Sequence, residues 1–221
     1  MLTMASFSTI VRAQVSAGPS DPTTGPPATA SAVAKVYCAG STITLTGPLD
    51  PSISAPFTKY HWWKLDATTG LKVEETTQTG QTYTEVSTTT PGYYNYWLVT
   101  ENANGCISPI SSLLQVYVLP PLSVTITTPV ASVCAGTTAP TLTANPTPAT
   151  PYALNYQWTL AGADITGATS STYTVPVDNT AETLTYAVKV SYALNPACSV
   201  TSANQNIVIT PLPTQPTITA N

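Results

Sequence analysis

A single histidine, His61, limits the acid–base chemistry that this chain can perform. A Ser-His-Asp or Cys-His site would have to use it. His61 stands in the run Tyr60-His61-Trp62-Trp63, which is typical of a strand, so we expect a surface or half-buried side chain there. Glu74 and Glu75 are neighbours whose side chains point to opposite faces of any strand, so they cannot act on one atom. The sequence therefore predicts no enzyme and no catalytic residues.

Metal ions, cofactors and nucleic acid are not expected either. Zinc sites use closely spaced Cys or Cys/His pairs, and the four cysteines here are far apart. No Asp-x-Asp run indicates a calcium loop, and the oxygen-rich run Glu101-Asn102-Ala103-Asn104-Gly105 is more typical of a turn. No glycine-rich loop suits a phosphate. A net charge of −4 with only six basic residues argues against a nucleic acid partner.

The chain repeats itself after 96 residues. The run 36–42, which contains Cys38-Ala39-Gly40, returns at 132–138, and Tyr60-His61-Trp62 returns as Tyr156-Gln157-Trp158. Further on, Gln81-Thr82-Tyr83-Thr84 corresponds to Ser171-Thr172-Tyr173-Thr174. A repeat of this length with a Cys…Trp…Cys order predicts one compact β domain used twice. Such serial domains are usually spacers, adhesive modules or binding modules.

Composition and alternation support an all-β fold of two tandem Ig-like β-sandwich domains. Charged residues make up 7% of the chain, against about 25% in ordinary soluble domains. No helical period of useful length is present, and turn residues such as Gly47-Pro48 and Pro91-Gly92 separate the apolar runs. Strands are predicted over residues 41–46, 58–65, 72–76, 81–86, 93–101 and 112–118, and over 141–144, 155–160, 171–175, 183–192 and 205–210.

Four cysteines, two in each repeat, predict one disulfide within each domain. The pairs would be Cys38–Cys106 and Cys134–Cys198, because these positions match between the repeats and any other pairing would have to cross from one domain to the other. Free thiols or a zinc site are the alternatives. Disulfides imply an oxidising compartment, so a secreted or cell-surface location is expected.

The domain boundaries follow from the repeat and from proline. Domain 1 is expected over residues 35–119 and domain 2 over 120–213, joined by the stiff run Leu119-Pro120-Pro121. Residues 1–13 are predicted to be a signal peptide remnant, with a disordered start as the alternative. Residues 14–34 are predicted to be a flexible lead-in. No apolar run is long enough to span a membrane.

The end of the chain resembles the start of the second repeat. The run Leu212-Pro213-Thr214-Gln215-Pro216-Thr217-Ile218-Thr219 is similar to residues 119–127. Residues 214–221 are therefore predicted to begin a third repeat, and other domains of a longer chain are expected as partners. The alternative is a C-terminal strand that pairs back onto domain 2.

These motifs resemble a known family. The runs Ala135-Gly136-Thr137, Tyr156-Gln157-Trp158, Ser171-Thr172-Tyr173-Thr174-Val175 and Pro211-Leu212-Pro213 are similar to the tandem Ig-like repeats of large secreted surface proteins of gliding and related Gram-negative bacteria. Proteins of that family are exported by the type IX secretion system. The resemblance implies a non-catalytic structural or adhesive segment of an exported cell-surface protein, with roles in cell adhesion and gliding motility.

One group of aromatic residues distinguishes the first repeat. If Trp62, Tyr96 and Leu98 face the core, alternation places His61, Trp63, Tyr93 and Trp97 together on the outer face of two neighbouring strands. The second repeat has polar or small residues at the matching positions. This candidate face predicts a binding module for a surface glycan or for a protein of the secretion or motility machinery. The alternative is that the lead-in or a neighbouring domain covers it.

Overall fold

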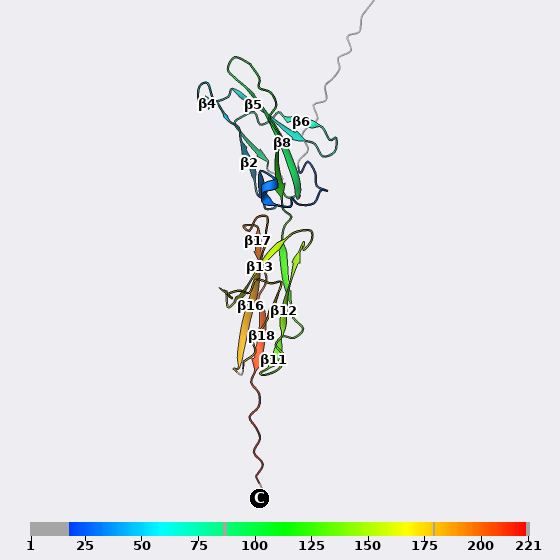
Figure 1. The fold of residues 1–221 in the computed structure, drawn as a ribbon, viewed down its shortest axis with the longest axis vertical. Coiled ribbons are helices and arrows are strands. Elements are labelled where there is room, and N and C mark those ends of the chain that lie inside the picture. Colours follow the sequence, from blue (N-terminus) through cyan, green and yellow to red (C-terminus); the bar gives the residue numbers. More distant parts are fainter. Residues whose placement is uncertain (1–17, 86–87, 179, 220–221) are drawn as a thin grey trace, which may run out of the picture. The chain divides into compact units, whose positions relative to one another are not determined.

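The computed structural model describes residues 18–85, 88–178 and 180–219 (Figure 1). The predicted signal peptide remnant, residues 1–13, lies outside the described residues. The chain divides into two compact units, Met1–Leu119 and Pro120–Asn221, which we call domain 1 and domain 2. Apart from one short 3-10 helix, η1 (Ala30–Ala32), all regular elements in the described part are strands, so the predicted all-β fold is confirmed. Within that part, no helix is long and apolar enough to cross a membrane.

Domain 1 is built from a large and a small sheet. The large sheet has the strand order β1-β9-β8-β5-β6, and the small sheet pairs β2 with β7. A further short pair joins β3 to β4. The bounds are β1 (Lys35–Tyr37), β2 (Ile43–Thr46), β3 (Leu49–Asp50), β4 (Ala55–Pro56), β5 (Lys59–Leu65), β6 (Lys72–Glu75), β7 (Thr82–Glu85), β8 (Gly92–Glu101) and β9 (Leu114–Val118).

Domain 2 repeats this plan with one strand more in its smaller sheet. That sheet has the order β10-β12-β15, and the larger sheet has the order β11-β18-β16-β13-β14, with β17 also paired to β16. The bounds are β10 (Ser123–Thr127), β11 (Ser132–Cys134), β12 (Thr141–Thr147), β13 (Leu154–Leu160), β14 (Ala163–Asp164), β15 (Thr172–Thr174), β16 (Glu182–Tyr192), β17 (Ser199–Thr201) and β18 (Gln205–Thr210). Both domains are consistent with an Ig-like sandwich.

Each core lies between the two sheets of its domain and is centred on the predicted tryptophan. In domain 1, Ile43 and Leu45 of the small sheet pack with Trp62, Tyr94 and Tyr96 of the large one. In domain 2, Leu142 and Val175 pack with Trp158, Val188 and Ile207 in the same way. Each indole donates to a backbone carbonyl, Trp62 to Gly80 at 3.0 Å and Trp158 to Ser170 at 2.9 Å, so its buried N–H is satisfied. The core positions of both tryptophans are confirmed.

Candidate binding face of domain 1

The outer face of the large sheet brings two of the predicted aromatic residues together. In β5 the side chains of Tyr60, Trp62 and Lys64 are buried, which turns His61 and Trp63 outward. Trp63 and Trp97 are register partners on β5 and β8. Directly opposite residues of an antiparallel pair have Cβ atoms about 4.5–5.5 Å apart, so the two side chains start from neighbouring positions on this face. Both are partly exposed.

His61 lies beside this pair and is held between two carboxylates. Its Nδ1 is 2.6 Å from Glu74 Oε1, and its Nε2 is 3.3 Å from Glu101 Oε2. Lys59 Nζ is 3.4 Å from the same Glu101 oxygen. The hydrogen bond from His61, followed by Lys59, holds the pKa of Glu101 below its usual value. These contacts on both sides fix the orientation of the ring.

Trp97 is also touched by a cation. Lys72 Nζ lies 4.1 Å from the centroid of the Trp97 ring, within the range of a cation–π contact. The Trp63 indole is different, because its Nε1 is buried and has no hydrogen-bond partner among the described residues. A buried donor left without a partner costs about 1–3 kcal/mol.

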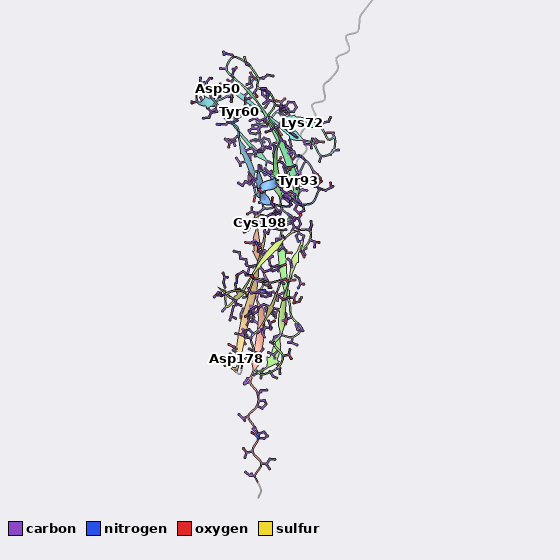
Figure 2. All side chains as sticks on the ribbon, in the orientation of Figure 1. Asp50, Tyr60, Lys72, Tyr93, Asp178 and Cys198 are labelled. Carbon is purple, nitrogen blue, oxygen red and sulfur yellow. The ribbon has the colours of Figure 1, made fainter. Side chains whose placement is uncertain are left out.

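Tyr93 does not join the two tryptophans. Its ring packs edge-on against Tyr117, with centroids 4.8 Å apart. Its backbone is hydrogen-bonded to the segment before β1, because Ser20 N and Asp21 N donate to the Tyr93 carbonyl and Tyr93 N donates to the Asp21 carbonyl. Figure 2 shows Tyr93 well separated from Lys72, the residue that contacts Trp97. The candidate face thus comprises His61, Trp63 and Trp97, with Tyr93 apart from it.

Part of the expected flexible lead-in accounts for the surroundings of Tyr93. Asp21 forms an isolated bridge with Tyr93 on the edge of β8 beyond the end of β5, and Asn95 N donates to Ser20 Oγ at 3.1 Å. Gly92 permits this approach, since a Cβ there would lie 2.5 Å from the Asp21 carbonyl oxygen. Its φ of +139° is also one that favours glycine. Residues 20 and 21 therefore cover the Tyr93 end of the sheet.

Domain 2 lacks the aromatic pair. Its register partners at the same sheet position are Thr159 and Ala187, and Gln157 pairs with Lys189 beside them. In the part of the chain that the structure describes, no group of three or more His, Cys, Asp or Glu side chains is arranged to hold a metal ion.

The predicted disulfides are wrong. Cys38 and Cys198 are disulfide-bonded, whereas Cys106 and Cys134 are exposed free thiols. Each predicted pair, Cys38–Cys106 and Cys134–Cys198, therefore contains one free cysteine, and neither intradomain bond is present.

The strand order explains why neither pair can form. Cys38 lies near the start of β8, because it follows Tyr37, which pairs with Val118, and Val118 pairs in turn with Gly92. Cys106 lies near the other end of β8, because it is hydrogen-bonded to Asn102, the residue just after that strand. That strand has ten residues, so its ends are roughly 30 Å apart at about 3.3 Å per residue. A disulfide needs Cα atoms within about 7 Å.

The same separation holds in domain 2. Cys134 lies near the start of β16, because its register partner Thr210 follows Ile209, which pairs with the first residue of β16. Cys198 lies near the end of β16, because its carbonyl accepts a hydrogen bond from the N–H of Tyr192, the last residue of that strand. Matching positions in two repeats therefore did not mean that the two cysteines of one repeat are neighbours.

A buried charged network in domain 1 was missed by the sequence analysis. Lys64 Nζ lies 2.6 Å from Glu85 Oε2, and both side chains are almost wholly buried. The hydroxyls of Tyr83 and Tyr96 donate to the same Glu85 oxygen at 3.3 and 3.4 Å. Burial, followed by the charge of Glu85, raises the pKa of both phenols, and it raises that of Tyr94 to about 12. The alternation in β5 could have indicated that Lys64 is buried, because Lys64 is two residues after the core residue Trp62 and its side chain points to the same face of the sheet.

No protein-family model matches this chain, and no curated protein is similar to it in sequence. Among solved structures, it is similar to the fibronectin(III)-like modules of Clostridium thermocellum CbhA, at 13% identity and a TM-score of 0.46, over 81% of this chain and 90% of that one. Chicken CNTN1 FN1-FN3 domains match at 13% identity and a TM-score of 0.41, over 78% of this chain and 62% of that one.

The three N-terminal domains of the bacteriophage RB49 outer capsid protein Hoc match at 22% identity and a TM-score of 0.37, over 79% of this chain and 56% of that one. This chain thus spans less than two thirds of the chicken and phage chains. The Ig-like assignment follows from the strand order and register described above.

Proposed function

We propose that this chain is a non-catalytic structural and adhesive segment of an exported cell-surface protein, and that it is cargo of the type IX secretion system, as its resemblance to such repeats implies. The observation that carries the proposal is the repetition of one sandwich plan in two successive domains. Such series usually extend a protein from a surface or present it to a partner. The bonded state of Cys38 and Cys198 supports an oxidising location outside the cytoplasm.

Location in the native host tests this proposal. We expect an antibody against domain 2 to label intact cells, and protease added outside the cells to remove the label. In a strain without the type IX system, the label should disappear from the surface and the protein should be retained inside. Protein found only in the cytoplasm, with Cys38 and Cys198 reduced, would contradict the proposal.

A second candidate function is a binding module that acts through the face formed by His61, Trp63 and Trp97. The cross-strand Trp63–Trp97 pair favours it, because the C–H faces of sugar rings and aliphatic side chains of proteins both stack on indoles. Glu74, which is level with Trp63, and Glu101 and Lys59 at the His61 end of the face add hydrogen-bonding groups suited to hydroxyls or to a polar protein surface.

Converting this face to its domain 2 counterpart tests the second function. Trp63→Thr with Trp97→Ala reproduces Thr159 and Ala187, and it should weaken binding to host glycans or machinery proteins by about tenfold or more. The fold should persist, since both side chains lie outside the core; circular dichroism and thermal melting check this. Thr159→Ala in domain 2 is the matched control and should bind as the wild type does. Unchanged binding combined with a lower melting temperature would show that the tryptophans serve only packing.

A further inference from the structure

Among the residues that the structure describes, the small sheet of domain 1 has no counterpart of one strand of domain 2, β10. In domain 2, β12 pairs with β15 and also with β10, whose register runs from Ser123 opposite Thr147 to Thr127 opposite Thr143. The corresponding strand in domain 1 is β2, because Leu45 pairs with Tyr83 as Leu142 pairs with Tyr173. Within the described residues, β2 pairs only with β7. No strand of the described part of the chain pairs with its other edge.

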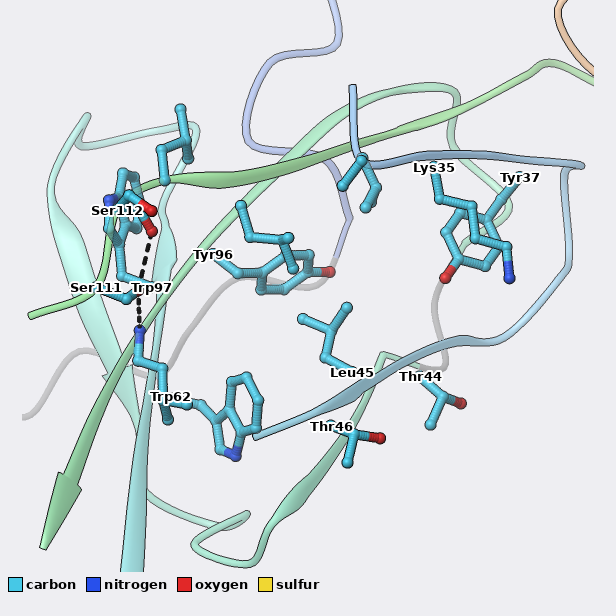
Figure 3. A pocket seen from close by; sticks show the side chains of 15 residues that line it. Lys35, Tyr37, Thr44, Leu45, Thr46, Trp62, Tyr96, Trp97, Ser111 and Ser112 are labelled. Carbon is cyan, nitrogen blue, oxygen red and sulfur yellow. Dashed lines mark hydrogen bonds between the residues drawn. The ribbon is translucent and has the colours of Figure 1, made fainter. Parts of the chain in front are cut away.

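The missing strand also leaves a gap in the packing. In domain 2, Val124 of β10 is part of the core, and Ile126 packs against it. In domain 1, no residue before β1 belongs to the core cluster of the described side chains. Instead, a cavity of about 380 Å³ lies between the free edge of β2 and the β9 side of the large sheet. Leu45, Trp62 and Tyr96 point toward this space (Figure 3).

The local sequence explains why the lead-in does not fill this position. β10 begins nine residues before β11, and the residues at the same distance before β1 include Pro26, Pro27 and the start of η1. Proline cannot donate to a ladder and η1 is not extended. The earlier residues Ser20 and Asp21 are bonded to Tyr93 on β8, which belongs to the other sheet. The edge of β2 is therefore open to an added strand from elsewhere.

The chain carries a segment of the right kind after β18, and it includes residues that are also predicted to begin a third repeat. Residues 211–219 follow β18, belong to no strand and are exposed throughout, and Ile218 is 95% exposed. Thr217-Ile218-Thr219 repeats the triplet Thr125-Ile126-Thr127 of β10. The segment is uncharged, as are all the side chains around the cavity except Lys35. Pro216 is tolerated because an added strand is an edge strand and needs to bond on one side only.

We propose that the free edge of β2 accepts residues 214–219 of a second copy of this chain as an added antiparallel strand. Thr219 then stands opposite Thr46, as Thr127 stands opposite Thr143, and Ile218 enters the cavity. Main-chain hydrogen bonds supply affinity and the inserted side chain supplies specificity, as in other cases of strand addition. The contact joins different surfaces of two copies, so it continues from copy to copy instead of closing as a symmetric pair does.

Self-association of the full chain tests this proposal. We expect concentration-dependent assemblies in sedimentation, and Ile218→Asp should weaken association by about tenfold or more, because it places a charge in an apolar cavity. Folding should not change, since Ile218 is exposed. Leu212→Asp, in the same exposed tail but outside the added strand, is the matched control and should associate as the wild type does.

A peptide of residues 213–219 provides a second measurement. It should bind the full chain, compete with self-association and shift the amide resonances of Thr44, Leu45 and Thr46. A wild-type chain that stays monomeric and ignores the peptide would overturn the proposal. So would association that survives Ile218→Asp but is lost in the Trp63→Thr/Trp97→Ala variant, protection of the tail within a monomer, or a glycan that shifts these resonances when the peptide does not.

Discussion

Replacing Lys64 by leucine, or Glu85 by valine, is expected to destabilise domain 1 by about 3–5 kcal/mol, because each change removes one member of a buried ion pair. The ion pair is 2.6 Å long, and its two side chains are 2% and 6% exposed. The double variant Lys64→Leu/Glu85→Val should recover most of the loss. It reproduces domain 2, where Leu160 pairs with Tyr186 as Lys64 pairs with Tyr96, and where Val175 follows β15 at the position of Glu85.

Urea unfolding followed by tryptophan fluorescence measures this effect, since Trp62, Trp63 and Trp97 all belong to domain 1. Lys59→Leu is the control, because Lys59 is 53% exposed and its pair with Glu101 is worth at most about 1 kcal/mol. Single variants as stable as the wild type would show that the Lys64–Glu85 pair is not buried in solution.

Trp158→Ala is expected to destabilise domain 2 by a similar amount, about 3–5 kcal/mol. The Trp158 side chain is fully buried, donates to the Ser170 carbonyl and packs against Tyr173 with ring centroids 6.0 Å apart. Its removal leaves a cavity at the centre of the core and a carbonyl without its donor. For a domain of about 100 residues, a loss of 3 kcal/mol lowers the melting temperature by at least about 12 °C.

Differential scanning calorimetry and amide exchange along β16 and β18 measure this loss. Trp158→Phe keeps much of the ring volume and should cost less. Leu212→Ala, in the exposed tail, should leave the transition of domain 2 where it is. A transition unmoved by Trp158→Ala would mean that the sheets do not pack around this indole.

The main strands of the fold were predictable because alternation determines them locally. The strand around Trp62 was expected over 58–65 and is Lys59–Leu65, and the strand around Tyr186 was expected over 183–192 and is Glu182–Tyr192. The parallel strands β1 and β11 were not predicted. Each has only three residues, and each gains its hydrogen bonds from the last strand of its domain, so no local pattern indicates it.

The candidate face was predicted less completely for a related reason. Alternation correctly turned Trp63 and Trp97 outward, and strand neighbourhood placed them side by side. Alternation could not show that β5 ends before it is level with Tyr93. Nor could it show that Ser20 and Asp21, in place of β5, form hydrogen bonds with Tyr93. The cysteine pairing failed similarly, because spacing along the chain does not show at which end of β8 or β16 each cysteine lies.

The parallel pairing of β1 with β9 also determines how domain 1 bears mechanical tension. β1 is the first strand of the domain and β9 is the last, and they run side by side in the same direction over three residue pairs. A pull on the two ends of the domain drags these strands past each other, so the hydrogen bonds between them are sheared together and do not open one by one. β11 and β18 repeat this arrangement in domain 2. Because Cys38 and Cys198 are disulfide-bonded, tension on the two ends of the chain passes through that bond and around the residues between them. The clamp in each domain is therefore loaded only after the disulfide is reduced, and it then yields only when several hydrogen bonds break at once.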